Sequence, residues 1–306
     1  MFGDLSGKLN WKIPAHENQV KIFQLICVAF YVLPLSSVLA NEGQNDTSAW
    51  TIPSEKQQFH VFLLMGQSNM SGFGKVLPED KKPSPFIVKL PTKGNLKWKP
   101  AAHPLHNRLK SDRFGLGLPF ATEYLKDKPG IVVGLIPVAR GGAGIDRLQK
   151  GTPIYADAIK KARFAKTQGS IKGVLWHQGE SDTVSEVLAS TYETKLHQLI
   201  ADVRKDMGDD QLPFIVGNLA EFYGTSKEHG KPDRVKRINK VRGIFRALPR
   251  KVEYSGFVES TGCSSPDHHR VHFDRKSYLI LGERYAKVYS KMTAKNAGKS
   301  DARDGK

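Results

Sequence analysis

Four polar segments of this chain carry residue types that together could form a hydrolytic site. Three of them contain glycine and lie around Ser68, Gly142 and Gln178, each soon after a run of apolar residues. The fourth, residues 266–274, is rich in histidine and aspartate. A serine nucleophile, a histidine base, a carboxylate that orients the histidine and fixed donors for the oxyanion make up a hydrolytic triad site. The segments therefore predict nucleophilic hydrolysis, provided that the fold brings them together.

The position of Ser68 in the predicted fold favours this chemistry. Residues 61–65 are all apolar, which is typical of a central strand covered on both faces. Gly66 allows a tight turn, so Ser68 lies between the end of a strand and the start of a helix. Ligands bind at this edge of open α/β sheets, where helix N–H groups stabilise negative charge. The local pattern alone is equally consistent with a Ser68 that only caps the helix.

The elements that must position these residues alternate between strand and helix. This alternation predicts a three-layer α/β/α fold with a central parallel five-stranded sheet, in which the strand ends share one edge. Residues 74–112 are rich in Lys and Pro with little periodicity and predict a long surface loop near the site. After the strand before Ser68, further strands are expected at 131–139, 171–176, 213–219 and 251–258, and helices at 115–125, 153–166, 184–206, 233–247 and 274–292.

The amino terminus resembles an export signal. Lys21, an apolar run over 22–33 and small residues up to Ala40 predict a secretory signal peptide cleaved after Ala40. A retained membrane anchor is the alternative, but the run is short and Pro34 interrupts it. Residues 1–19 do not belong in front of such a signal, which suggests a start assigned too early. The mature protein is then expected to be secreted or periplasmic and free of the membrane. The predicted organisation is a signal region at 1–40, a linker at 41–58, one hydrolase domain at 59–292 and a charged tail at 293–306.

Composition excludes several other classes of protein. The formal net charge is +17, which attracts acidic partners, but Lys and Arg are spread along the chain. There is no basic block interleaved with stacking aromatics, so a nucleic-acid partner is not expected. Cys27 would leave with the signal and Cys263 would remain alone, so neither an intramolecular disulfide nor a cysteine-rich metal site is expected.

The polar segments also resemble a known superfamily. In their order and spacing they are similar to the blocks of the SGNH hydrolases, and more narrowly to the sialate O-acetylesterase and carbohydrate esterase family 6 (acetyl xylan esterase) branch. The resemblance extends over residues 59–290. It implies a flavodoxin-like sheet and the removal of O-acetyl groups from sugars without a metal or other cofactor. The blocks are 66–70 (GQSNM), 140–142 (RGG), 176–182 (WHQGESD) and 271–273 (VHF).

The resemblance implies a role for each matching residue. Ser68 is the implied nucleophile, and its own N–H is one oxyanion donor. Gly142, or its neighbour Gly141, supplies a second N–H, and the side-chain amide of Gln178 a third. The implied base is His272, which stands before an aromatic residue and the final helix. The rival histidines in the same segment are His268 and His269.

The acid that supports the base is left open. Members of the family commonly have aspartate three residues before the catalytic histidine, where this chain has His269. Asp267, two residues earlier, is one candidate. Glu180 is the other, because some members of the branch are thought to use that glutamate. Asp274 is expected to cap the closing helix instead.

The implied partner is an acetylated carbohydrate. The resemblance places Gln67, Asn69, Arg140 and His177 near the substrate, although Gln67 and Asn69 can instead orient the turn. Arg140, Arg147 and the overall positive charge favour an acidic sugar, unless both arginines are ordinary surface residues. Two other functions are consistent with the sequence, a lipase- or thioesterase-like SGNH hydrolase and a catalytically silent carbohydrate-binding protein.

Overall fold

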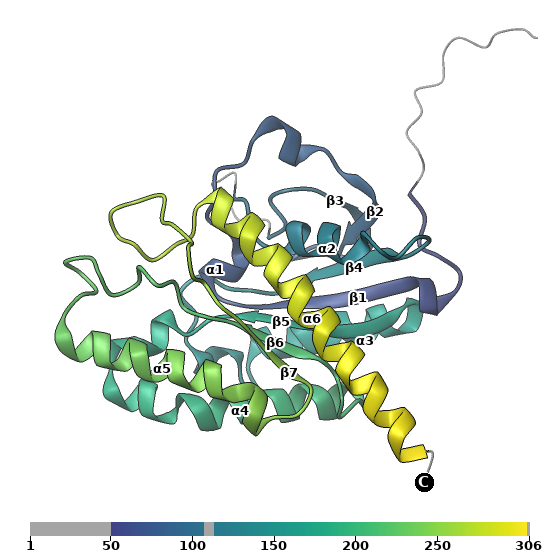
Figure 1. Ribbon diagram of the computed structural model, residues 1–306. Coiled ribbons are helices and arrows are strands. Elements are labelled where there is room, and N and C mark those ends of the chain that lie inside the picture. Colours follow the sequence, from purple (N-terminus) through teal and green to yellow (C-terminus); the bar gives the residue numbers. More distant parts are fainter. Residues whose placement is uncertain (1–49, 107–112, 305–306) are drawn as a thin grey trace, which may run out of the picture. The chain divides into compact units, whose positions relative to one another are not determined.

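The computed structural model describes residues 50–106 and 113–304. Within this part, seven strands form one sheet in the order β3-β2-β4-β1-β5-β6-β7 (Figure 1). Every neighbouring pair is parallel except β2 with β3. The strands are β1 (Phe59–Gly66), β2 (Ser84–Lys89), β3 (Lys99–Ala101), β4 (Val132–Pro137), β5 (Ser170–His177), β6 (Phe214–Gly217) and β7 (Ser255–Val258).

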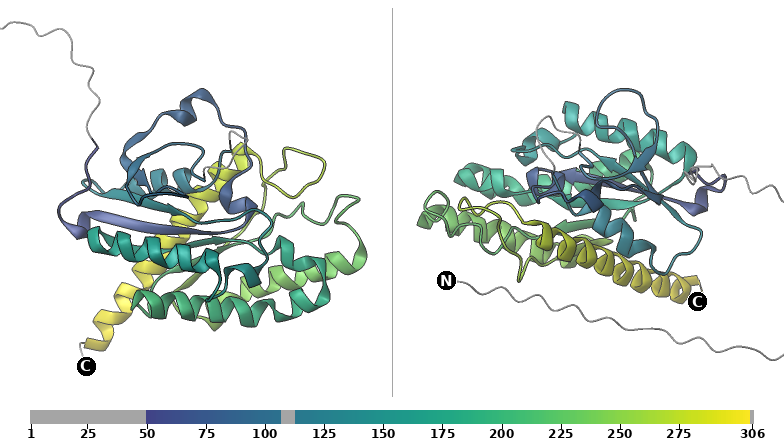
Figure 2. Two further views of the ribbon diagram at one scale, coloured as in Figure 1. Left: turned by 180° about the vertical axis from the view of Figure 1, so that it is seen from behind. Right: turned by 90° about the horizontal axis from the view of Figure 1, so that it is seen from above.

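Helices cover both faces of the sheet and complete the expected three layers. α2 and α6 pack against each other on one face, and α3 and α4 cover the other, where α5 lies beside α4 (Figures 1 and 2). No helix within the described residues combines the length and the hydrophobicity needed to cross a membrane. The helices are α1 (Ser68–Ser71), α2 (Gly117–Leu125), α3 (Pro153–Gln168), α4 (Glu186–Met207), α5 (Pro232–Lys251) and α6 (Arg275–Asp304).

The central strands are apolar because both of their faces are covered. All residues of β1 except His60 are buried, and so are all six of β4. Gly66 ends β1 with a φ of 139°, and a side chain there would meet the carbonyl group of His177 on β5. This close approach of the two backbones places the turn after β1 directly beside the turn after β5.

The expected strand count of five is wrong, because two strands lie within residues 74–112. The sequence did not indicate β2 and β3 as strands, because they contain Pro85 and Pro100 and extend the sheet to its edge. Proline is depleted in strands and is tolerated at sheet edges, so such strands lack a clear apolar run.

The structure tests the predicted carboxyl-terminal tail but not the predicted signal region. The closing helix α6 runs to Asp304, through residues that the sequence assigned to a charged tail. The predicted signal region and most of the linker lie outside the described residues. In the remainder of the linker, Trp50 and Ile52 pack against the core.

Candidate active site

Ser68 and His272 meet at the carboxyl end of the sheet. Ser68 is the first residue of α1, directly after β1, and its Oγ lies 3.0 Å from Nε2 of His272. The serine side chain does not cap the helix, since the N-cap position belongs to Gln67 and no side-chain cap bond forms. A neutral imidazole at this distance can accept the hydroxyl proton.

The imidazole of His272 is held in its neutral form. Burial lowers its pKa to about 4, and the charges of Arg113 and His269 act in the same direction, whereas Asp267 raises the pKa. A base must be unprotonated to accept a proton. His272 therefore meets that requirement throughout the neutral range.

Asp267 influences His272 by its charge rather than by contact. Its Oδ1 accepts a hydrogen bond from the backbone N–H of Arg270 at 3.2 Å, and Arg270 adopts a φ of 53° in that tight turn. No hydrogen bond joins Nδ1 of His272 to any residue that the structure describes. Among the described residues, Asp267 therefore makes a turn within its own loop and no direct bond to His272.

Among the described residues, Asn69 is the link between Glu180 and the histidine loop. Its Oε1 accepts a hydrogen bond from Nδ2 of Asn69 at 2.5 Å, and the same amide nitrogen donates to the carbonyl oxygen of Val271 at 3.0 Å. Oδ1 of Asn69 accepts from the hydroxyl of Tyr278 at 3.0 Å and the N–H of Phe273 at 3.4 Å. Asn69 is fully buried, which favours the alternative that it orients the turn: its hydrogen bonds tie the serine turn to the histidine loop.

Glu180 lowers the free energy of unfolding by an amount that depends on pH. Burial raises its pKa to about 7, and Oε2 has no hydrogen-bond partner among the described residues. Because the folded-state pKa lies above the unfolded value, ionisation destabilises the fold. The cost is absent below about pH 4.5, grows as the pH rises toward 7 and is complete above that value.

We expect Glu180→Gln to stabilise the protein at pH 8 but much less at pH 5. A pKa shift of this size corresponds to ~3 kcal/mol of free energy of unfolding, which the substitution restores at pH 8. The gain is reduced by the penalty for a buried glutamine N–H group that has no acceptor. Urea unfolding of both proteins at the two pH values measures the difference in free energy of unfolding. An equal difference at pH 5 and pH 8 would mean that Glu180 is not a destabilising buried carboxylate.

The side-chain amide of Gln178 joins the three turns instead of offering a free donor. Its Nε2 donates to Oε1 of Gln67 and to the carbonyl oxygen of Ala143, both at 3.1 Å, and also to the carboxylate of Asp182. Its Oε1 accepts from the hydroxyl of Tyr192 at 2.8 Å. Two amide hydrogens are shared among three acceptors, so the expectation of a third oxyanion donor is corrected to a positioning role.

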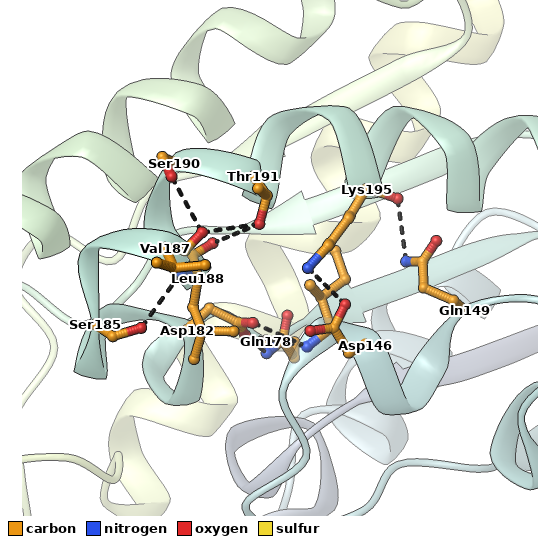
Figure 3. Close-up of polar contacts among 11 residues, drawn as sticks. Asp146, Gln149, Gln178, Asp182, Ser185, Val187, Leu188, Ser190, Thr191 and Lys195 are labelled. Carbon is orange, nitrogen blue, oxygen red and sulfur yellow. Dashed lines mark hydrogen bonds and ion pairs between the residues drawn. The ribbon is translucent and has the colours of Figure 1, made fainter.

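Asp182 fixes the turn that follows β4. Its two carboxylate oxygens each lie 3.1 Å from the backbone nitrogen of Ile145, which donates to them. Figure 3 shows that the next residues of that turn contact α4 through Lys195. The ammonium group of Lys195 pairs with the carboxylate of Asp146 at 2.6 Å. The backbone carbonyl oxygen of Lys195 accepts a hydrogen bond from the side-chain amide of Gln149 at 3.1 Å. Burial raises the pKa of Asp182 to about 6. The glycine turn is therefore anchored from both the β5 turn and α4.

Gly142 stands at the exposed tip of this anchored turn. The N–H of Ala143 donates to the carbonyl oxygen of Arg140 at 3.1 Å, and Gly142, at the third position of this turn, has a φ of 68°, which glycine adopts without steric cost. Within the described residues, the backbone N–H groups of Gly142 and Ser68 have no acceptor. Both are available to a ligand, as an oxyanion donor must be.

Three further residues were assigned roles from the sequence: His177 and Arg140 near the substrate, and Asp274 at the start of the closing helix. His177 is fully buried, with Nδ1 3.2 Å from the hydroxyl of Tyr285 and its ring edge-on to Phe273. The expected contact of His177 with substrate is therefore corrected, because this last residue of β5 is directed into the core. Arg140 stays half-buried, 3.8 Å from the carboxylate of Asp157. Asp274 accepts from the N–H of Ser277 at 2.8 Å and so supports the start of α6, as expected.

Sequence reasoning missed two residues that shape the site. Asp182 ends the 176–182 block but was assigned no role there, because its importance comes from a backbone N–H 37 residues away. Phe73 also gave none, although its ring stacks on His272. Among the described residues, no group of three or more His, Cys, Asp or Glu side chains could hold a metal ion.

Comparisons with known proteins cover the whole sheet and its turns. The family model described as carbohydrate esterase, sialic acid-specific acetylesterase, matches residues 58–291. The probable carbohydrate esterase At4g34215 of Arabidopsis thaliana is 33% identical over 184 residues, which are 54% of this chain and 70% of that protein. Its X-ray structure is similar with a TM-score of 0.65 at 29% identity, over 76% of this chain and 98% of that chain. The crystal structure of NanS, 17% identical, shares the fold with a TM-score of 0.65 over 80% of this chain and 100% of that chain.

Proposed function

This chain belongs to the carbohydrate esterase, sialic acid-specific acetylesterase family and is a carboxylic ester hydrolase, and on that premise we propose that it removes O-acetyl groups from sugars through an acetyl-serine intermediate on Ser68. The observation that carries the proposal is the 3.0 Å distance between Oγ of Ser68 and Nε2 of His272. Both groups stand at the sheet edge where α/β enzymes bind ligands.

The first half of the reaction forms the intermediate. His272 accepts the hydroxyl proton of Ser68 while Oγ attacks the acetyl carbonyl carbon. The N–H groups of Ser68 and Gly142 donate to the resulting oxyanion, and each such donor contributes ~3 kcal/mol in the transition state. The intermediate then expels the sugar oxygen, which takes the proton from His272, and the acetyl group stays on Ser68.

The second half releases acetate. A water molecule gives a proton to His272 and attacks the acetyl carbon, through a second oxyanion held by the same two N–H groups. Collapse of this intermediate returns the proton to Oγ of Ser68. Every proton that leaves one oxygen arrives on another through His272, so no further reactant is needed.

We assign the acid's task to the charge of Asp267. The reaction makes His272 an imidazolium twice, and a nearby carboxylate stabilises that cation. Glu180 instead holds Asn69, and through it the backbone of the histidine loop.

Asp267→Asn is expected to lower kcat about tenfold, which corresponds to the loss of a through-space attraction of ~1.4 kcal/mol. The pKa of His272 should fall at the same time, because Asp267 raises it in the wild type. Steady-state kinetics with p-nitrophenyl acetate from pH 3 to pH 9 measures both. A Glu180→Gln variant with the larger loss of kcat would transfer the acid's role to Glu180.

The substrate class is best tested with a panel of acetylated sugars. We propose an acidic sugar, because Arg140 stands beside the Gly142 turn and the chain carries a net charge of +17. Acetate release from O-acetylated sialic acids, acetylated pectin and acetylated xylan should be fastest with the first two. A preference for acetyl xylan would place the enzyme with family 6, and faster hydrolysis of p-nitrophenyl butyrate than of the acetate would indicate a lipase-like enzyme.

Secretion is part of the same proposal. A signal peptide cleaved after Ala40 would deliver the enzyme to sugars outside the cytoplasm. Sequencing the amino terminus of the mature protein tests this: the first residue should be Asn41.

A further inference from the structure

Phe73 lies flat against the catalytic imidazole. Its ring centroid is 3.5 Å from that of His272, and the two planes differ by 5°. On the same aromatic ring, the guanidinium carbon of Arg113 lies 3.5 Å from the centroid. Phe73 comes directly after Gly72, which ends the serine turn. Gly72 turns the chain with a φ of 95°, and a side chain at this position would meet the carbonyl group of Phe114. The segment that carries Ser68 thus also carries the surface on which His272 rests.

The imidazole needs such a support. In a Ser-His-Asp triad, the aspartate holds the ring orientation through a hydrogen bond to Nδ1. Here no described residue makes that bond, and Asp267 contributes charge without fixing the ring. Rotation of an imidazole about its last side-chain bond is only weakly restricted by its own geometry. A flat contact on one face restricts it, because rotation would drive the ring edge into Phe73.

We propose that Phe73 is a positioning residue, whose ring fixes the plane of His272 so that Nε2 points at Oγ of Ser68. Orientation and charge, which a triad aspartate supplies together, are divided here between Phe73 and Asp267. This inference rests on the proposed function, in which His272 is the base.

The stack also controls how the imidazole titrates. The charged groups that act on it are Asp267, Arg113 and His269, and burial is the largest influence on its pKa. Phe73 supplies part of that burial on one face. Without the ring, water reaches this face and the pKa of His272 rises from about 4 toward its ordinary value of ~6.5.

The experiment compares Phe73→Leu, which replaces the flat ring by a smaller apolar side chain and so uncovers part of the imidazole face, with Phe73→Tyr, which keeps the ring. Phe257→Leu is the matched control, because Phe257 is also half-buried against the core but lies on β7. With p-nitrophenyl acetate, Phe73→Leu should lower kcat about 10- to 100-fold with KM changed less than ~3-fold, as misorientation of a catalytic group predicts. Phe73→Tyr and Phe257→Leu should stay within ~3-fold of wild type.

A titration of His272 by NMR provides a second readout that does not depend on turnover. The Cε1–H signal of His272 is identified by its absence in His272→Asn, and its pKa should rise by 1 unit or more in Phe73→Leu but not in Phe73→Tyr. Phe73→Leu with wild-type kcat, or Phe73→Tyr as impaired as Phe73→Leu, would overturn the inference. If Ser68→Ala remained active, the proposed function itself would fail, while the shift in pKa would still report on the stack.

Discussion

Ser68→Ala is expected to lower kcat/KM for p-nitrophenyl acetate by about 10⁴-fold or more, because alanine has no oxygen to form the acetyl intermediate. The fold should be unaffected. The hydroxyl makes its single hydrogen bond among the described residues to His272, and the backbone hydrogen bonds of α1 do not involve the side chain that is removed. Initial rates at several ester concentrations give kcat/KM, and thermal unfolding checks the fold.

Ser71→Ala is the matched control for that variant. Ser71 lies in the same short helix, and its hydroxyl donates to the backbone carbonyl of Gln67 at 3.3 Å, away from His272. It should keep most of the activity. Comparable losses in Ser68→Ala and Ser71→Ala would mean that the turn matters only as structure, and Ser68 would no longer be the nucleophile.

His272→Asn is expected to lower kcat about 10³- to 10⁴-fold and to abolish the acid limb of the pH profile. The wild-type kcat/KM should fall below about pH 4, where His272 becomes protonated, and stay level through the neutral range. A variant without the imidazole has no group to titrate there. Measuring kcat/KM from pH 3 to pH 9 for both proteins tests the loss and the change in profile together.

His269→Asn separates the base from its neighbours. His269 is exposed, and its Nδ1 lies 3.3 Å from the carboxylate of Glu228 on a neighbouring loop. The kcat/KM of His269→Asn should stay within ~3-fold of wild type. A loss in His269→Asn equal to that in His272→Asn would contradict the assignment of the base.

The sequence was informative wherever local pattern and burial agree. The apolar run before Ser68 became β1 because a central strand is covered on both faces. The alternation of strands and helices predicted the layers correctly, and the helices expected at 153–166 and 184–206 are α3 and α4. The edge strand β3 and its neighbour β2 were missed because they are short and carry proline and lysine, which obscure a strand pattern.

The site was predictable in its reacting groups but not in their support. Ser68 and His272 could be selected by residue type and motif, since a triad requires those types. Whether an amide such as that of Gln178 faces the ligand or the interior depends on its neighbours in space, and here three acceptors already occupy it. Phe73 could not be chosen because its role comes from a ring about 200 residues away.

The proposed mechanism requires that Ser68 is the activated nucleophile, and covalent labelling tests that directly. Diethyl p-nitrophenyl phosphate, which phosphorylates activated serines, should add one diethyl phosphoryl group per chain, and peptide mass mapping should place it on Ser68. His272→Asn should react far more slowly, because the serine then lacks its base. An active wild-type enzyme labelled at another residue, or a Ser68→Ala variant labelled as fast as wild type, would contradict the mechanism.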